Sequence, residues 1–138
     1  MPDLSSIVKA YDIRGVVGEH LDAATVRDIG AAFARLVGDA VQPLMGGAYS
    51  PSAVVIGHDM RESSPGLATA FADGVTEQGL DVVLIGLAST DMLYFASGSL
   101  NLPGAMFTAS HNPAKWNGIK LCRAGASPVG QDTGLIEI

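Results

Sequence analysis

The stretch TASHNPAKWNGIK, residues 108–120, places a serine, Ser110, at the end of an apolar run and before a histidine and an asparagine. Such a serine is a candidate nucleophile. Acyl-transfer hydrolases need small residues two places either side of their serine, and here Thr108 and Asn112 disfavour that chemistry. No Gly-x-x-x-x-Gly-Lys loop occurs, which disfavours an ordinary nucleotide kinase. Transfer of a phosphoryl group to and from Ser110 stays open, as does a structural role in an Asn-Pro turn.

The charge distribution around Ser110 favours an anionic ligand. The whole chain carries a net charge of −6, yet residues 92–131 contain no aspartate or glutamate. The same window contains His111, Lys115, Lys120 and Arg123. A locally positive field in an acidic protein attracts an anion such as a phosphorylated metabolite.

Two other segments carry charged pairs that suit the same chemistry. In KAYDIRGVVG, residues 9–18, Arg14 could bind phosphate with both arms of its guanidinium, or form a surface ion pair with Asp12. In GHDMRESSP, residues 57–65, Asp59 and Arg61 lie between an expected strand and an expected helix. Bracing of that loop is the favoured interpretation for this pair, with anion binding as the alternative.

Apolar periodicity predicts the elements that must position these segments. Short apolar runs predict strands within residues 52–59, 81–87, 104–110 and 118–124, and helical spacing predicts helices within 21–41, 60–80 and 89–100. We expect Asp22 to cap the first helix. Ser64 as N-cap and Pro65 as first residue should begin the second, which Gly79 should end. This alternation predicts an α/β fold with a mostly parallel sheet covered by helices on both faces.

The remaining segments predict less. The segment QPLMGGAYSPS, residues 42–52, is expected to be a surface loop. The final stretch GQDTGLIEI, residues 130–138, is typical of the start of a new element, so we expect a fragment of a longer protein. Cys122 is expected to be a buried strand side chain rather than a nucleophile.

Composition sets the class of protein. With 48% hydrophobic and 16% charged residues, the 138-residue chain is typical of one globular domain. Its acidity argues against binding to nucleic acid or to anionic membranes. A single cysteine excludes an internal disulfide, and the N-terminus is unlike a secretory signal. We therefore expect a cytoplasmic protein.

Taken together, KAYDIRG, GHDMRESSP and TASHNP followed by NGIK resemble the first domain of the α-D-phosphohexomutases, a family that includes phosphomannomutases and phosphoglucomutases. The three motifs occur in the family's order across nearly all of the chain, and the serine loop looks most like that of the phosphomannomutases. The resemblance implies a three-layer α/β/α fold with a mixed, mostly parallel sheet. It also implies that residues 1–138 form domain I, with domains II–IV absent from this chain.

The resemblance implies a catalytic role for four residues. Ser110 would carry the phosphoryl group that passes to a hexose phosphate, giving a bound 1,6-bisphosphate that reorients and returns its other phosphate. Lys120 would be the general acid/base, with Arg14 near the same proton transfer. His111 would shape and polarise the phosphoserine loop.

It also implies ligands and cofactors. Tyr11, Asn112 and Lys120 would bind substrate, and Ser110 would contribute one metal ligand through its phosphate. The cofactors would be Mg²⁺, with its other ligands in domain II, and a hexose 1,6-bisphosphate as activator. The partners would be mannose or glucose 1- and 6-phosphates, with no nucleic acid or membrane, and domain I would pack against domains II–IV.

Because those domains are missing from the chain, we expect the isolated chain to be inactive and prone to self-association. The alternative hypothesis is a stand-alone phosphosugar-binding or regulatory module without turnover, and a serine hydrolase is a distant third.

Overall fold

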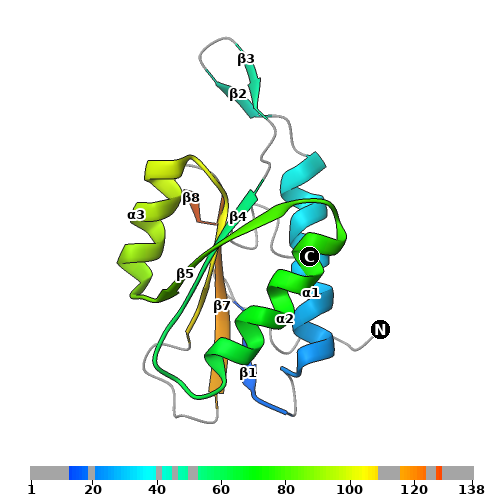
Figure 1. Ribbon diagram of the computed structural model, residues 1–138, viewed down its shortest axis with the longest axis vertical. Helices are drawn as coiled ribbons and strands as arrows, with labels where there is room; N and C mark the ends of the chain where they lie inside the picture. The colour runs from blue at the N-terminus through cyan, green and yellow to red at the C-terminus, as the bar shows by residue number, and fades with distance from the viewer. Residues whose placement is uncertain are drawn as a thin grey trace.

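The computed structural model describes residues 13–18, 21–39, 42–44, 47–49, 53–108, 116–123 and 127–128. Their elements are shown in Figure 1. In chain order they are β1 (Ile13–Val16), α1 (Ala23–Asp39), β2 (Gln42–Leu44), β3 (Gly47–Tyr49), β4 (Ala53–His58), α2 (Ser64–Glu77), β5 (Asp81–Leu87), α3 (Thr90–Leu100), β6 (Gly104–Phe107), β7 (Trp116–Arg123) and β8 (Ser127–Pro128).

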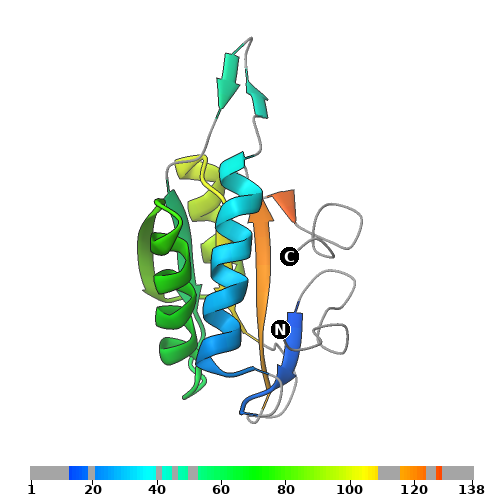
Figure 2. The same cartoon turned by 90° about the vertical axis from the view of Figure 1, so that its right-hand side faces the viewer.

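The main sheet has six strands in the order β1-β7-β6-β4-β5, with β8 also paired to β7. Strand β4 runs parallel to both β5 and β6. Strand β7 runs antiparallel to β6, β1 and β8, so within this sheet it alone opposes the direction of the others. Figure 2 shows β1 and β8 along one edge of the long strand β7. The sheet is therefore mixed, with every strand except β7 pointing the same way, which confirms the prediction of a mixed sheet.

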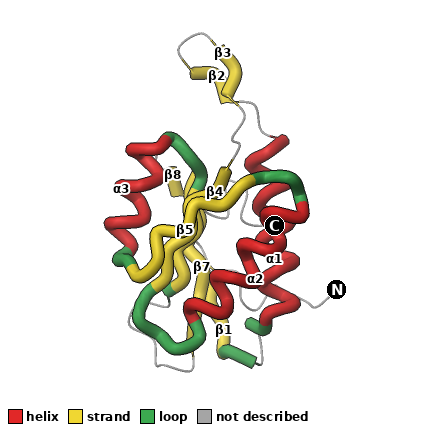
Figure 3. Tube along the Cα trace, in the orientation of Figure 1, coloured by secondary structure: helices red, strands yellow, loops and turns green. Residues whose placement is uncertain are grey.

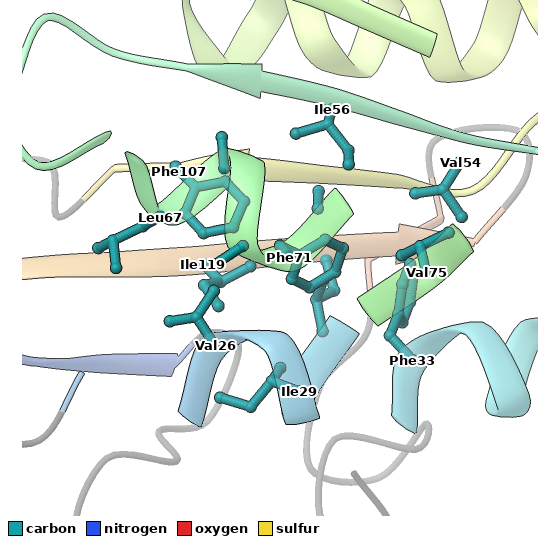
Figure 4. Close-up of a cluster of buried hydrophobic side chains, with 14 of the residues drawn as sticks. Val26, Ile29, Phe33, Val54, Ile56, Leu67, Phe71, Val75, Phe107 and Ile119 are labelled. Atoms are coloured by element: carbon teal, nitrogen blue, oxygen red, sulfur yellow. The ribbon is translucent and has the colours of Figure 1, made fainter. Parts of the chain in front are cut away.

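Helices cover both faces of the sheet, with α1 and α2 on one face and α3 on the other (Figures 1 and 3). Alternate side chains of the inner strands consequently enter two separate clusters. Ile56 and Phe107 belong to the larger cluster under α1 and α2, which Figure 4 shows. The smaller cluster under α3 contains Val55, Leu93, Met106 and Cys122. This arrangement confirms the three-layer fold.

The two helices on the larger cluster approach each other through glycines. A β carbon at Gly30 of α1 would lie 2.3 Å from the backbone oxygen of Phe71, and one at Gly74 of α2 would lie 2.0 Å from a backbone oxygen of α1. This close approach brings aromatic rings together underneath: the centroid of Phe71 lies 6.0 Å from that of Phe33 and 5.4 Å from that of Phe107.

The helix ends agree with the predictions at two places and differ at a third. Asp22 caps α1 by accepting a 2.7 Å hydrogen bond from the Thr25 backbone N–H. Gly79, with φ of +88°, follows the end of α2 as predicted. The predicted start of α2 is wrong by one residue, since Ser63 is the N-cap and Ser64 is already helical. Ser64 directs its hydroxyl to an aspartate in the preceding loop instead of to its own helix.

Three further findings were not predicted. Segment 42–52, expected to be a loop, contains the antiparallel strands β2 and β3, which form a ribbon extending from one end of the molecule in Figure 1. Strand β1 is an additional edge strand. Strand β5, although apolar in sequence, leaves several side chains exposed because it forms the other edge. Three residues per strand in the ribbon and four in β1 are too few to give a clear periodic signal. Residues 130–138 lie outside the described residues.

The glycine contact between α1 and α2 yields a stability prediction. Gly74→Ala should lower the free energy of unfolding by about 2 kcal/mol or more, because the new methyl group meets backbone that cannot rotate away. Gly66→Ala in the same helix is the matched control, since no atom lies within 4 Å of its added β carbon. We expect Gly66→Ala to be neutral or to stabilise the protein by up to about 1 kcal/mol, because alanine favours a helix over glycine and meets no neighbouring atom here. Urea unfolding of both variants measures the difference, and equal midpoints would contradict the packing argument.

Candidate active site

Strands β6 and β7 hold the two ends of the predicted serine loop close together. Phe107 pairs with Ile119 in the antiparallel register, and the backbone N–H of Thr108 donates to the Gly118 carbonyl over 3.0 Å. The described residues on either side of segment 109–115 therefore lie at the same end of the paired strands β6 and β7. Four of the predicted site residues fall outside the described residues: Tyr11, Ser110, His111 and Asn112.

Gly118 lies where three chain segments meet. A β carbon on this residue would lie 2.5 Å from the Ile13 backbone oxygen, 2.8 Å from Arg14 Cγ and 2.9 Å from the Thr108 backbone oxygen. Any larger residue would push apart β1, β7 and the chain leaving β6. The glycine of the NGIK motif thus allows Ile13 and Arg14 of the N-terminal motif and Thr108 of the serine motif to lie against the same point of β7.

Arg14 and Lys120 lie on the same face of the sheet. Arg14 pairs with Gly118, and Lys120 follows two residues later on β7. Side chains opposite each other in an antiparallel pair share a face, as do alternate residues of one strand. Lys120 pairs with Met106, whose side chain belongs to the cluster under α3, so this is the α3 face. Both predicted cationic residues are half-buried.

Asp59 is the centre of a polar network beside the same loop. Its backbone N–H donates to the Phe107 carbonyl over 3.0 Å, which ties the β4–α2 loop to the end of β6. Its carboxylate accepts hydrogen bonds from Ser64 Oγ at 2.6 Å and from the Arg61 backbone N–H at 3.1 Å. Arg61 Nε lies 3.2 Å from the other carboxylate oxygen, and the Thr108 side chain also hydrogen-bonds Asp59.

These contacts determine the ionisation of Asp59. The side chains of Asp59 and Arg61 are only 12% and 8% exposed. Burial alone would raise the pKa of Asp59, but hydrogen bonds from Ser64, Arg61 and Thr108, together with the Arg61 charge, hold that pKa below its ordinary value of 3.8. The carboxylate is thus kept ionised by its neighbours.

Asn117 connects the other end of the serine loop to this network. Its side chain is fully buried, and its Nδ2 donates to Ser63 Oγ at 2.8 Å and to Ser64 Oγ at 3.0 Å. Its Oδ1 accepts a 2.8 Å hydrogen bond from the Gly118 backbone N–H. Since Ser64 in turn donates to Asp59, a continuous polar chain runs from Asn117 to the carboxylate.

Sequence reasoning did not predict the main contacts between these segments. The predicted bracing role of Asp59 and Arg61 agrees with their mutual ion pair and with their contacts at the start of α2. The pairing of Asn117 with Ser63 and Ser64 was missed. Its only sequence signals are an Asn-Gly before a strand and two serines before a proline, and both are common in turns.

Other features of the described residues complete the description of the site. Within the described ranges no group of three or more histidine, cysteine, aspartate or glutamate side chains could hold a metal ion. None of the helices in this part of the chain has the length and apolar character needed to cross a membrane. Cys122 is a buried side chain of β7, as predicted. Its burial raises the pKa of the thiol.

The comparisons with known proteins agree with this geometry. The family model for phosphoglucomutase/phosphomannomutase, alpha/beta/alpha domain I, matches residues 5–137. The chain therefore belongs to the phosphoglucomutase/phosphomannomutase family. This confirms the resemblance inferred from the three motifs.

Curated relatives give a more particular likeness. The chain is 41% identical over 131 residues to a phosphomannomutase of Salmonella typhimurium, covering 94% of this chain and 26% of that protein. It is 40% identical over the same length to a phosphomannomutase of Klebsiella pneumoniae, of which it covers 76%. The chain thus spans about a quarter of the length of the Salmonella relative.

Solved structures show the same fold. A phosphoglucomutase/phosphomannomutase family protein from Burkholderia thailandensis superposes with a TM-score of 0.78 at 40% identity, covering 96% of this chain and 29% of that one. A putative phosphomannomutase from Thermus thermophilus gives the same TM-score of 0.78 at 32% identity, with 94% and 28% covered.

The ionisation of Asp59 predicts an acid-dependent stability. A carboxylate whose pKa is lowered on folding stabilises the protein above its ordinary pKa and loses this contribution as pH falls. Asp59→Asn should therefore lower the free energy of unfolding at pH 7 by about 1–3 kcal/mol. The difference from the unsubstituted protein should shrink as the pH falls below 3.8.

Chemical denaturation at pH 7 and at about pH 3 measures both values. Asp73→Asn, an exposed residue of α2, is the control and should change stability little at either pH. A difference for Asp59→Asn that is equally large at both pH values would contradict the electrostatic explanation.

Proposed function

We propose that the complete protein is a phosphohexomutase, with phosphomannomutase as its activity, that interconverts hexose 1-phosphates and hexose 6-phosphates. The observation that carries this proposal is the convergence at Gly118, where Arg14 lies opposite the NGIK motif and Lys120 follows on the same face. The curated phosphomannomutases at 40–41% identity support the choice of substrate class.

In this proposal Ser110 carries the phosphoryl group. The serine O–P bond breaks while the free hydroxyl oxygen of the hexose phosphate forms a new O–P bond. The hydroxyl proton passes to the neutral Lys120 amine at Nζ, and the released Ser110 oxygen takes up a proton from solvent. The resulting 1,6-bisphosphate reorients, and Ser110 Oγ attacks its other phosphorus and releases its proton to solvent. The sugar O–P bond breaks there, and the sugar oxygen takes the proton back from Lys120 Nζ. Arg14 acts beside the same proton transfer, and its charge stabilises the phosphoryl oxygens. Lys120 adds a second positive charge once it has accepted the hydroxyl proton.

The remaining roles follow the family pattern. We assign His111 to shaping the phosphoserine loop, and Tyr11 and Asn112 to binding the hexose phosphate. Mg²⁺ bound beside the phosphoserine would neutralise charge on the phosphoryl oxygens. Ser110 would supply one ligand through its phosphate, and an aspartate-rich loop of domain II would supply the others. A hexose 1,6-bisphosphate would phosphorylate the resting serine.

We also propose that residues 1–138 form domain I of this cytoplasmic enzyme and that domains II–IV supply the rest of the site. The isolated chain would then bind and turn over hexose phosphates poorly or not at all. Exposed apolar side chains support further packing. Of the large apolar side chains that are exposed among the described residues, all but Met60 lie on β5 or α3 or at their ends: Val83, Leu84, Leu87, Met92, Phe95 and Leu100.

The catalytic part of this proposal predicts the behaviour of Ser110→Ala in the full-length protein. With mannose 1-phosphate, Mg²⁺ and a trace of hexose 1,6-bisphosphate, turnover should fall by about a thousandfold or more, because the phosphoryl carrier is lost. Ser99→Ala, at an exposed position of α3, is the control and should keep full activity. Phosphopeptide mapping should find phosphate on residue 110 of the unsubstituted protein only. Saturable hexose phosphate binding without turnover in any form would instead favour the binding-module alternative.

The exposed apolar side chains predict self-association of the isolated chain. Phe95→Glu combined with Leu87→Glu should shift sedimentation toward the monomer, because two of the most exposed apolar side chains, at 77% and 66%, become charged. Met60→Glu, which replaces the most exposed apolar residue but lies outside β5 and α3, should leave the self-association unchanged. A monomeric profile of the unsubstituted chain at all concentrations would contradict this prediction.

A further inference from the structure

We infer that Asp59 is a positioning residue for the serine loop: it holds both ends of segment 109–115, through Phe107 and Thr108 at the start and through Ser64 and Asn117 at the end. The inference rests on the proposed function for its kinetic consequences, but the geometry that carries it is independent of any activity.

The start of the segment is held directly. The Asp59 backbone N–H donates to the Phe107 carbonyl over 3.0 Å, and the Thr108 side chain hydrogen-bonds the Asp59 carboxylate. Thr108 is itself buried and lies only two residues before Ser110. Asp59 therefore contacts Phe107 through its backbone and Thr108 through its side chain, and these are the last two described residues before Ser110.

The end of the segment is held through Ser64. This fully buried hydroxyl donates to Asp59 Oδ1 over 2.6 Å and accepts from Asn117 Nδ2 over 3.0 Å. Asn117 directs its other side-chain atom to the Gly118 N–H, so the amide plane cannot rotate without breaking bonds at both ends. Hydrogen bonds to an ionised acceptor are stronger than neutral ones, so the charge of Asp59 strengthens the first link of this chain.

The carboxylate is in turn held from the other side by Arg61. The ion pair and the Arg61 backbone N–H fix both carboxylate oxygens, and both side chains are largely buried. A neutral amide at position 59 would keep the shape but would lose the charge and present two donors toward groups that already donate. The ends of the loop would then lose their common anchor while the strand pairing of β6 with β7 stayed in place.

Such a role has a distinct kinetic signature. Misplacement of a reacting atom by about 1 Å costs about a hundredfold in rate. In the full-length protein we expect Asp59→Asn to lower kcat by about tenfold to a hundredfold, with a smaller effect on the KM for hexose phosphate, because of the proposed sugar-binding residues only Asn112 belongs to segment 109–115. Ser64→Ala removes the hydrogen bonds of Ser64 to Asp59 and to Asn117 but leaves the contacts of Asp59 with Phe107 and Thr108, so it should show a smaller loss of the same kind.

Asp22→Asn is the matched control. Asp22 is also a carboxylate that accepts a hydrogen bond at the start of a helix, but its partner is Thr25 of the same helix, outside the network of Asp59, Ser64 and Asn117. It should lower thermal stability and leave kcat and KM unchanged. All variants are compared at a temperature at which circular dichroism shows each to be folded. A kcat for folded Asp59→Asn equal to that of Asp22→Asn would overturn the positioning role.

A second readout keeps the inference testable if the mutase activity is absent. Hydrogen–deuterium exchange of the full-length protein should be faster in peptides covering 109–115 for Asp59→Asn, and unchanged there for Asp22→Asn. Absence of turnover in the unsubstituted protein would refute the proposed function alone. Unchanged exchange of 109–115 in folded Asp59→Asn would refute the positioning inference, whatever the activity.

Discussion

The close approach of three chain segments at Gly118 is the constraint on which the candidate site depends. Backbone oxygens of Ile13 and Thr108 occupy the space in which any other residue would place its side chain. Only a hydrogen fits there, so β1 can lie against β7 while the chain leaving β6 crosses beside it. The position of Arg14 opposite the NGIK motif follows from this contact, because the β1–β7 register places these residues directly across from each other.

A charged network, rather than apolar packing, completes the structure at this edge of the sheet. A buried carboxylate is costly unless its lone pairs are satisfied, and Asp59 meets that condition with partners from its own loop, from α2 and from the end of β6. Among the described residues no buried side-chain nitrogen or oxygen lacks a hydrogen-bond partner. Polar contacts of this kind accept only a narrow range of geometries, whereas apolar contacts tolerate sliding, so the network suits a place where loop ends must be held in register.

The rest of the fold provides a rigid support on one side and an incompletely covered surface on the other. Glycine contacts let α1 and α2 lie close together over the larger cluster, where the ring of Phe71 packs against those of Phe33 and Phe107. The opposite face has α3 and a smaller cluster, and the exposed apolar side chains gather on β5 and α3. The face under α1 and α2 therefore forms a buried core, while the side with α3 and β5 retains exposed apolar surface suited to further packing.

Much of the fold could be predicted from the sequence because it depends on local pattern. The periodicity of α1, the apolar runs of β4 and β6, and the caps at Asp22 and Gly79 are set by neighbours within a few residues. The three motifs likewise identified the family without any coordinates. Strand β1 was not predictable, because its four residues form a strand only by pairing with β7 near the other end of the chain. The same holds for Ser64, whose expected cap role gave way to Asp59 and Asn117. The sequence by itself determined which residues could do chemistry and which segments were helices or strands. Only the tertiary structure decided which of them meet, because hydrogen bonds and close contacts between distant segments depend on the packing of the whole sheet.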